Sequence, residues 1–113
     1  MRSMGTLIYG HGDLSVDFED RTLAHLQVVI GTKLRRRESF LMSWSEDAQE
    51  SERRTSIWLD SSVPMYFRYS SPRVPDLNHD WIALLMAGAN SAAGLGLVAE
   101  PVTRADTPRA HRS

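Results

Sequence analysis

The sequence predicts an α+β fold, a two-layer sandwich with a mainly antiparallel sheet of about six strands and two helices on one face. Three observations predict it. Apolar and polar residues alternate over several short segments, as in strands that have one buried and one solvent-exposed face. Two longer stretches, residues 20–37 and 78–91, instead carry apolar residues at helical spacing. The segments follow the order β-β-α-β-β-β-α-β, and their short or polar connections favour antiparallel neighbours.

The N-terminal segment predicts a β-hairpin. Residues 5–9 (GTLIY) indicate a first short strand, and Gly10-His11-Gly12-Asp13 follows as a tight turn. Residues 14–18 then alternate cleanly, with Leu14, Val16 and Phe18 on the face that we expect to be buried.

The first helix is the clearest element of the sequence. Its apolar stripe, at spacings of three, four and four residues, consists of Leu23, Leu26, Ile30 and Leu34. We expect Asp20 to cap the helix start, and the cations at the far end to complement the negative end of the helix dipole. His25 is expected on the exposed, polar side of this helix.

The middle of the chain predicts three consecutive strands, at residues 40–45, 56–60 and 63–69. The polar residues 46–54 between the first two are expected to form an exposed loop. Pro64 lacks a backbone N–H, so the start of the third strand is expected at a sheet edge or outside the ladder.

The C-terminal part predicts a second helix, a short strand and a tail. Asn78 is the expected helix cap, and Gly94 is placed to end the helix. A last strand is expected at residues 95–99. Residues 1–102 are therefore read as one α+β domain, and the polar residues 103–113 as a disordered tail.

The composition limits the classes of function. The chain has 113 residues, of which 42% are hydrophobic, enough for one small core, and its net charge is -1. This charge argues against a generally basic nucleic-acid binder. The chain has no cysteine, which suits a reducing cytoplasm. Since no apolar run approaches the ~18 residues of a membrane span, we expect a cytoplasmic protein without a membrane partner.

No catalytic motif is present, so we expect no catalytic residue, no metal and no cofactor. The four histidines, His11, His25, His79 and His111, lack metal-ligand spacing. The serines do not occupy G-x-S-x-G, and the glycines form no complete phosphate-binding loop. The leading hypothesis is accordingly a non-enzymatic domain that acts through protein contacts or homo-oligomerisation.

A basic cluster closes the first helix, with Lys33, Arg35, Arg36 and Arg37 inside five positions. Such a cluster binds phosphates through arginine forks, which makes nucleic-acid binding the alternative function. The competing interpretation is a solvated helix end, balanced by Glu38 and by the acidic residues of segment 46–54.

A second candidate binding surface combines Trp58, Tyr66 and Arg68. If Ile57 and Leu59 face the core, these three side chains point outward on consecutive strands and form an aromatic–cationic patch beside Ser43 and Ser45. Such a patch suits a protein interface, a homodimer in particular, or the stacking of nucleobases. The alternative is an aromatic ladder that only stabilises the sheet.

Several long stretches resemble a family of short actinobacterial (Microbacteriaceae-type) proteins of unknown function. The resemblance is carried by MGTLIYG at Met4–Gly10, DFEDRTLAHLQVVIGTKLRRRESFLMSW at Asp17–Trp44, SIWLDSSVPMYFRYSSPRVP at Ser56–Pro75 and a W-I-x-x-L-M-x-x-A-N-S-A-A-G-L run from Trp81. It extends to Pro101.

Members of such families often carry the name ATP-dependent DNA ligase, which implies at most an accessory role in DNA repair here. The lysine of this chain, Lys33, lies outside any K-x-D-G motif, the signature of an adenylated lysine. The resemblance therefore implies no catalytic residue.

Overall fold

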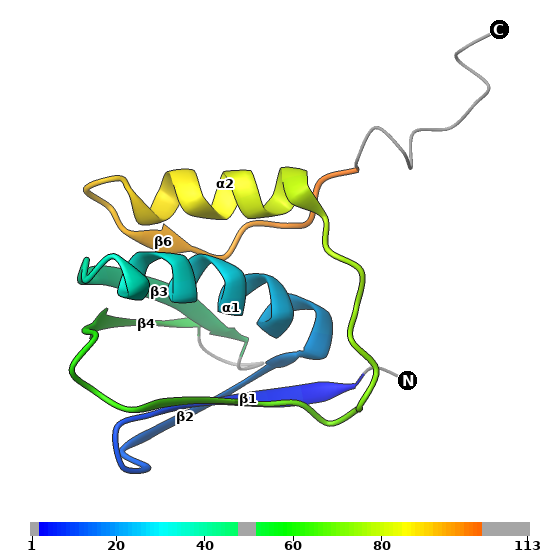
Figure 1. The fold of residues 1–113 in the computed structure, drawn as a ribbon, viewed down its shortest axis with the longest axis horizontal. Helices are drawn as coiled ribbons and strands as arrows, with labels where there is room; N and C mark the ends of the chain where they lie inside the picture. The colour runs from blue at the N-terminus through cyan, green and yellow to red at the C-terminus, as the bar shows by residue number, and fades with distance from the viewer. Residues whose placement is uncertain (1–2, 48–51, 103–113) are drawn as a thin grey trace, which may run out of the picture.

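The computed structural model describes residues 3–47 and 52–102, and within these ranges it contains six strands and two helices (Figure 1). In chain order the elements are β1 (Met4–Tyr9), β2 (Leu14–Glu19), α1 (Asp20–Arg35), β3 (Phe40–Asp47), β4 (Glu52–Leu59), β5 (Met65–Arg68), α2 (His79–Ala89) and β6 (Leu95–Gly96). The predicted α+β class, element order and number of strands are confirmed.

The six strands form two sheets of three, where the sequence predicted one. Sheet A has the order β2-β1-β5 and is antiparallel throughout. Sheet B has the order β4-β3-β6, with β3 and β4 antiparallel and the short β6 parallel to β3. Figure 1 shows both helices on the same side of sheet B, with sheet A below them.

The strand β5 accounts for the difference between one sheet and two. Instead of continuing the β3–β4 hairpin, it pairs with β1, and Phe67 lies opposite Leu7. Pro64 lies before the strand, as predicted, and its carbonyl accepts a hydrogen bond from Gly10 N at 2.8 Å. The half-buried Met65 and Phe67 thereby pack against the core.

The helix α1 occupies the centre of the molecule. It buries Leu23, Leu26 and Ile30 of the predicted stripe, leaves Leu34 half-buried, and buries further residues. It packs against β1 and β2 on one side and against α2 on another. A helix covered on two sides needs a wider buried surface than one lying on a single sheet. Its buried residues therefore also include Asp20, Ala24, His25 and Lys33.

The start of α1 corrects one prediction. Glu19 occupies the cap position and its side chain makes no capping bond, so Asp20 is not the cap. The buried Asp20 carboxylate instead accepts hydrogen bonds from the backbone N–H of Ser70 and Ser71 and from the Ser70 hydroxyl. Asp20 thus anchors the loop after β5 to the helix. In α2, by contrast, the predicted cap is confirmed, since the Asn78 side chain accepts from the backbone of residues 80 and 81.

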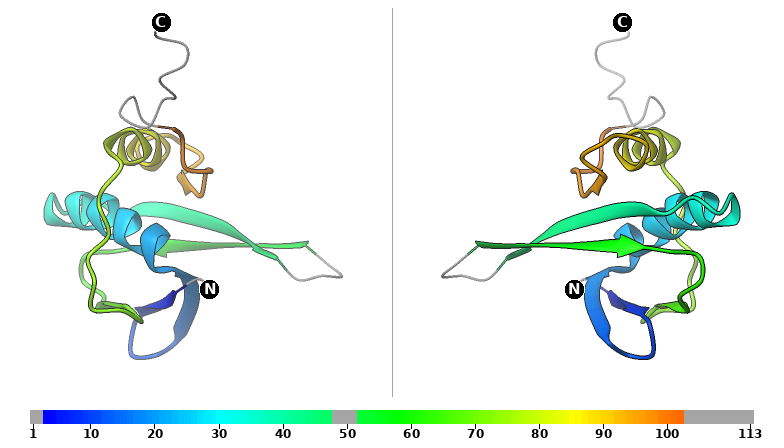
Figure 2. Two further views of the ribbon diagram at one scale, coloured as in Figure 1. Left: turned by 90° about the vertical axis from the view of Figure 1, so that its right-hand side faces the viewer. Right: turned by 90° about the vertical axis from the view of Figure 1, so that its left-hand side faces the viewer.

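The β3–β4 hairpin is longer than predicted and extends away from the helices (Figure 2). Residues 46, 47 and 52–54, expected in a loop, belong to the two strands, with Ser45 opposite Arg54. Residues 48–51 of that predicted loop and the predicted tail 103–113 lie outside the described residues.

One hydrophobic core joins the two sheets and the helices. Sheet A contributes Leu7 and Phe18, and sheet B contributes residues of β3, β4 and β6. The rings of Phe18 and Trp44 meet edge to face across the sheets, with centroids 6.2 Å apart. This shared core holds the outer surfaces of both sheets in fixed positions.

Candidate functional site

The outer face of sheet B is the side of β3 and β4 that faces away from the core. Its residues are Leu41, Ser43, Ser45, Arg54, Ser56 and Trp58. Trp58 is 60% exposed and lies opposite Leu41 in the register. Next to this pair, the hydroxyls of Ser43 and Ser56 share a hydrogen bond of 2.7 Å. A large aromatic side chain is thus presented to solvent on a rigid strand.

An open groove of about 570 Å³ lies on the same face, between β3 and the segment that contains β6. Its lining includes Leu41, Ser43, Arg54, Gly96 and Leu97. The glycine that precedes β6 lets the two segments approach. Gly94 has φ +89°, and a Cβ at this position would lie 2.6 Å from the carbonyl oxygen of Leu41.

The outer face of sheet A carries the other two residues of the predicted patch. Tyr66 is 57% exposed and lies opposite Ile8, and the exposed Arg68 lies opposite Thr6. Because β4 and β5 belong to different sheets, the structure corrects the expectation that Trp58 lies on a strand next to Tyr66 and Arg68. The predicted patch is divided between the two sheets.

Tyr9 connects the two sheets at the end of β4. Its hydroxyl donates to the backbone carbonyl of Trp58 at 3.0 Å and accepts from the backbone N–H of Asp60 at 3.1 Å. Asp60 in turn accepts from Ser39 and Ser62, and these hydrogen bonds lower the pKa of its carboxyl. The backbone that carries the exposed Trp58 ring is therefore tied to sheet A.

The basic cluster at the end of α1 separates into exposed and buried members. Arg35, Arg36 and Arg37 are exposed, and Arg37 has a φ of 61° where the chain leaves the helix. Lys33, by contrast, is 7% exposed. Three cations, rather than the predicted four, are therefore available to a ligand.

Lys33 is engaged inside the protein. Its Nζ donates to Asn90 Oδ1 at 2.6 Å and pairs with Glu38 Oε1 at 2.9 Å. It also lies 5.8 Å from the centre of the Phe40 ring. The hydrogen bond from Lys33 lowers the pKa of the Glu38 carboxyl. The lysine joins the end of α1 to the end of α2.

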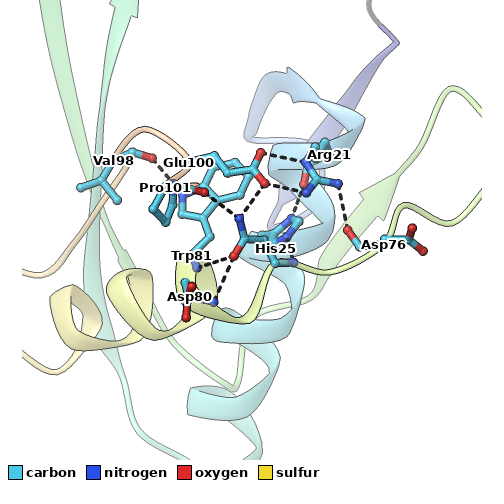
Figure 3. A network of polar contacts seen from close by, with 9 residues as sticks. Arg21, His25, Asp76, Asp80, Trp81, Val98, Glu100 and Pro101 are labelled. Atoms are coloured by element: carbon cyan, nitrogen blue, oxygen red, sulfur yellow. Dashed lines mark hydrogen bonds and ion pairs between the residues drawn. The ribbon is translucent and has the colours of Figure 1, made fainter. Parts of the chain in front are cut away.

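A partly exposed polar network, drawn in Figure 3, surrounds the buried His25 at the other end of the two helices. His25 is fully buried, and its ring lies 4.5 Å from that of Trp81. Nδ1 lies 2.7 Å from the carbonyl oxygen of Arg21, and Nε2 accepts from the backbone N–H of Asn78 at 2.8 Å. Burial is the main reason that the pKa of His25 is lowered.

Arg21, Glu100 and Asn78 complete the network (Figure 3). Arg21 binds both carboxylate oxygens of Glu100, at 2.8 and 2.6 Å, and also donates to the carbonyl of Asp76. Asn78 Nδ2 donates to Glu100 and to the carbonyl of Pro101, each at 2.9 Å. The hydrogen bond from Arg21 is the main cause that holds the pKa of Glu100 at about 2. The network fastens the C-terminal segment to both helices.

Sequence reasoning missed the buried positions of His25 and Lys33. For Lys33 a signal existed, because it lies seven residues after Leu26 and therefore shares its helical face. His25 carried no comparable signal, since its burial depends on the second helix and on the distant segment around Glu100.

A second, more enclosed groove of about 340 Å³ lies between α1 and the loop after β5. Its lining is mostly apolar and includes Ala24, Val28, Val74 and Leu77. The Tyr69 hydroxyl at this groove donates to Gln27, and burial raises the pKa of Tyr69 to about 12. This groove brings no acid–base pair together.

Residues 3–47 and 52–102 contain no group of three His, Asp or Glu placed to hold a metal ion. Within these ranges neither helix has the length and apolar content that a membrane crossing requires.

A family model described as "Domain of unknown function (DUF7882)" matches residues 4–100. The chain belongs to the DUF7882 family. The matched residues include all six strands and both helices, so the whole described fold is the DUF7882 domain. Comparison with curated proteins and with solved structures finds no match.

Proposed function

We propose that this DUF7882 protein is a non-enzymatic interaction domain, and that its principal partner is a second copy of the same chain. The observation that carries the proposal is Trp58, which is 60% exposed on the outer face of sheet B. Trp is among the residues most enriched in interface hot spots. A tryptophan held outward by a strand that Tyr9 ties to the rest of the protein is pre-organised for contact.

The outer face of sheet B also carries both a projecting aromatic ring and a groove. It presents the Trp58 ring and, on the same surface, an open groove of about 570 Å³ whose lining includes Ser43 and Gly96. In a twofold-symmetric dimer both copies use the same surface, so the ring of each copy meets the groove of the other. Trp58 is 60% exposed, so each of two such sites can bury that fraction of the about 150–250 Å² of an aromatic side chain, which gives the interface an apolar centre.

Sedimentation or light scattering over a wide range of protein concentration tests this proposal. Trp58→Ala is expected to weaken self-association by at least about 2 kcal/mol, which is about thirtyfold in the dissociation constant. Tyr66→Ala is the matched control, because Tyr66 is equally exposed but lies on sheet A. It is expected to change the free energy of association by less than about 0.5 kcal/mol.

A strict monomer that recovers no partner in a pull-down would refute the proposal. Equal effects of the Trp58 and Tyr66 substitutions would place the contact elsewhere. The protein could instead be a monomer that captures a different protein and no longer captures it after Trp58→Ala. That outcome would support the interaction function but would refute the homodimer.

Nucleic-acid binding at the end of α1 is the alternative function. Three adjacent exposed arginines, residues 35–37, favour it. It predicts binding that weakens with salt, with a slope of the logarithm of affinity near -0.9 for each phosphate contacted. Replacement of Arg35, Arg36 and Arg37 by Ala should abolish that binding, whereas Lys33 contributes nothing to it. Salt-independent binding, or none, would exclude this function.

A ligase activity is not part of the proposal. An adenylated lysine needs an accessible and activated amine, and Lys33 is bonded to Asn90 and Glu38 instead. Intact-mass measurement after incubation with ATP and magnesium is expected to show no adenylate. We also propose a cytoplasmic location, because a chain without cysteine suits a reducing compartment.

A further inference from the structure

His25 holds together three segments that are far apart in the sequence. It lies on α1, it accepts a hydrogen bond from Asn78 at the start of α2, and Asn78 in turn binds Glu100 and Pro101 of the C-terminal segment (Figure 3). Trp81, whose ring lies against His25, donates from Nε1 to the carbonyl of Val98 at 2.9 Å. Both residues that fasten the C-terminal segment to α2, Asn78 and Trp81, therefore contact this ring.

The hydrogen-bond partners determine the protonation state of His25. A backbone N–H can only donate, so Nε2, which faces Asn78 N, must be the acceptor. A carbonyl oxygen can only accept, so Nδ1, which faces Arg21 O, carries the proton. The ring is consequently neutral, in the Nδ1–H tautomer.

Protonation of this ring is incompatible with the observed contacts. A proton on Nε2 places two N–H donors against each other and leaves the buried N–H of Asn78 without an acceptor, which is costly. The charged groups around the ring come from each packed element: Arg21 on α1, His79 and Asp80 on α2, Asp76 before it, and Glu100 on the C-terminal segment. Arg21 and His79 oppose a positive charge on the ring, and Glu100 favours it.

We propose that His25 is a proton-operated latch, whose neutral ring holds the start of α2 and, through Asn78, residues 98–101, and whose protonation loosens these contacts while the pair between Arg21 and Glu100 persists. The loosening is local. Asn78 loses its backbone acceptor, and with Asn78 the bonds to Glu100 and Pro101 weaken. Since Leu97 lines the groove on the outer face of sheet B, the latch also controls one border of the proposed contact surface. The latch itself does not depend on the proposed dimer.

The pH window follows from linkage. The open form exposes His25, which then titrates near its ordinary pKa of about 6.5, whereas the closed form has a lower pKa. The open form therefore binds more protons as pH falls below about 6.5. Its population rises about tenfold for each pH unit, until the pH reaches the pKa of the closed form.

Two NMR measurements on the intact chain test the latch. Long-range ¹H–¹⁵N correlation at neutral pH is expected to show His25 as the Nδ1–H tautomer. Hydrogen exchange between about pH 8 and pH 5, corrected for intrinsic rates, is expected to show increased opening at the Asn78 amide and the Trp81 indole N–H. The amide of Leu26, in the buried centre of α1, should not follow the same pH dependence.

Two substitutions distinguish opening that is caused by protonation of His25 from a general loss of stability at low pH. His25→Gln keeps one donor and one acceptor but does not titrate, so the pH dependence of opening should disappear. His79→Gln, at the neighbouring exposed histidine, should retain the pH dependence, because His25 still titrates; loss of the His79 charge, which opposes protonation of His25, should only shift the midpoint. An Nε2–H tautomer, opening that is independent of pH, or pH dependence that persists in His25→Gln would each overturn the proposal. If His25→Gln fails to fold, the wild-type tautomer and exchange data still decide.

Discussion

Replacement of Lys33 distinguishes a structural lysine from a ligand-binding one. In Lys33→Ala, Asn90 Oδ1 loses a charged donor at 2.6 Å, a bond worth about 1.5–3 kcal/mol. The pair with Glu38 is half-exposed and screened by solvent, so it adds little to this loss. We therefore expect the free energy of unfolding to fall by about 2–3 kcal/mol, and the melting temperature by about 10 °C or more in a domain of this size.

Urea unfolding followed by tryptophan fluorescence measures this loss. Arg36→Ala removes a neighbouring but exposed cation and should change stability by less than about 0.5 kcal/mol. Lys33→Met keeps the buried stem and should recover about 1 kcal/mol relative to Ala. The pKa of Glu38, measured by NMR, should rise toward its ordinary value in both Lys33 variants. If Lys33→Ala lowers stability no more than Arg36→Ala, Lys33 is not a structural lysine.

Three further substitutions examine the contacts that hold the surfaces in place. Gly94→Ala combines a positive φ with a Cβ 2.6 Å from the Leu41 carbonyl, so a loss of about 2 kcal/mol or more is expected in thermal unfolding. Glu100→Gln should flatten the fall in stability as pH drops from 4.5 towards 2. The depressed pKa makes the carboxylate stabilising above 4.5, by about 1 kcal/mol with solvent screening. Tyr9→Phe should cost about 1–2 kcal/mol, because its hydroxyl joins the sheets. If stability, or its pH dependence for Glu100→Gln, is unchanged in one of these variants, that result contradicts the role assigned to the contact that the variant removes.

The fold class followed from the sequence because each strand and helix carries its own local pattern. The turn at Gly10 and Gly12, for example, requires the positive φ values found there, of 77° and 91°. The division into two sheets carried no such pattern. Whether β5 continues next to β4 or crosses to β1 depends on which edge lets Met65 and Phe67 reach the core, and alternation looks the same in both arrangements.

The sequence predicted which individual side chains are exposed, but not which of them lie together on one surface. The exposure of Trp58 and Tyr66 followed from strand alternation, and both are exposed. The placement of Trp58 and Tyr66 on different sheets did not follow from alternation, because it results from the pairing of β5 with β1. The network around His25 could not be predicted from the sequence, because Arg21, Asn78 and Glu100 meet only when three remote segments fold together. Helical periodicity locates a buried face and says nothing about polar partners from elsewhere.

The buried polar residues and the exposed ring of Trp58 differ in what explains their positions, and this difference supports the interaction function. The buried polar groups Asp20, His25, Lys33 and Asn78 each have hydrogen-bond partners inside the described part of the chain, so their positions follow from folding alone. The ring of Trp58 is different. Stability gains little from an aromatic side chain that is 60% exposed, although the strand beneath it is fixed at both its pairing edge and its end. A rigidly held ring left in solvent is what an interface residue looks like, and the groove on the same face is the reason that we propose a second copy of the chain as the partner.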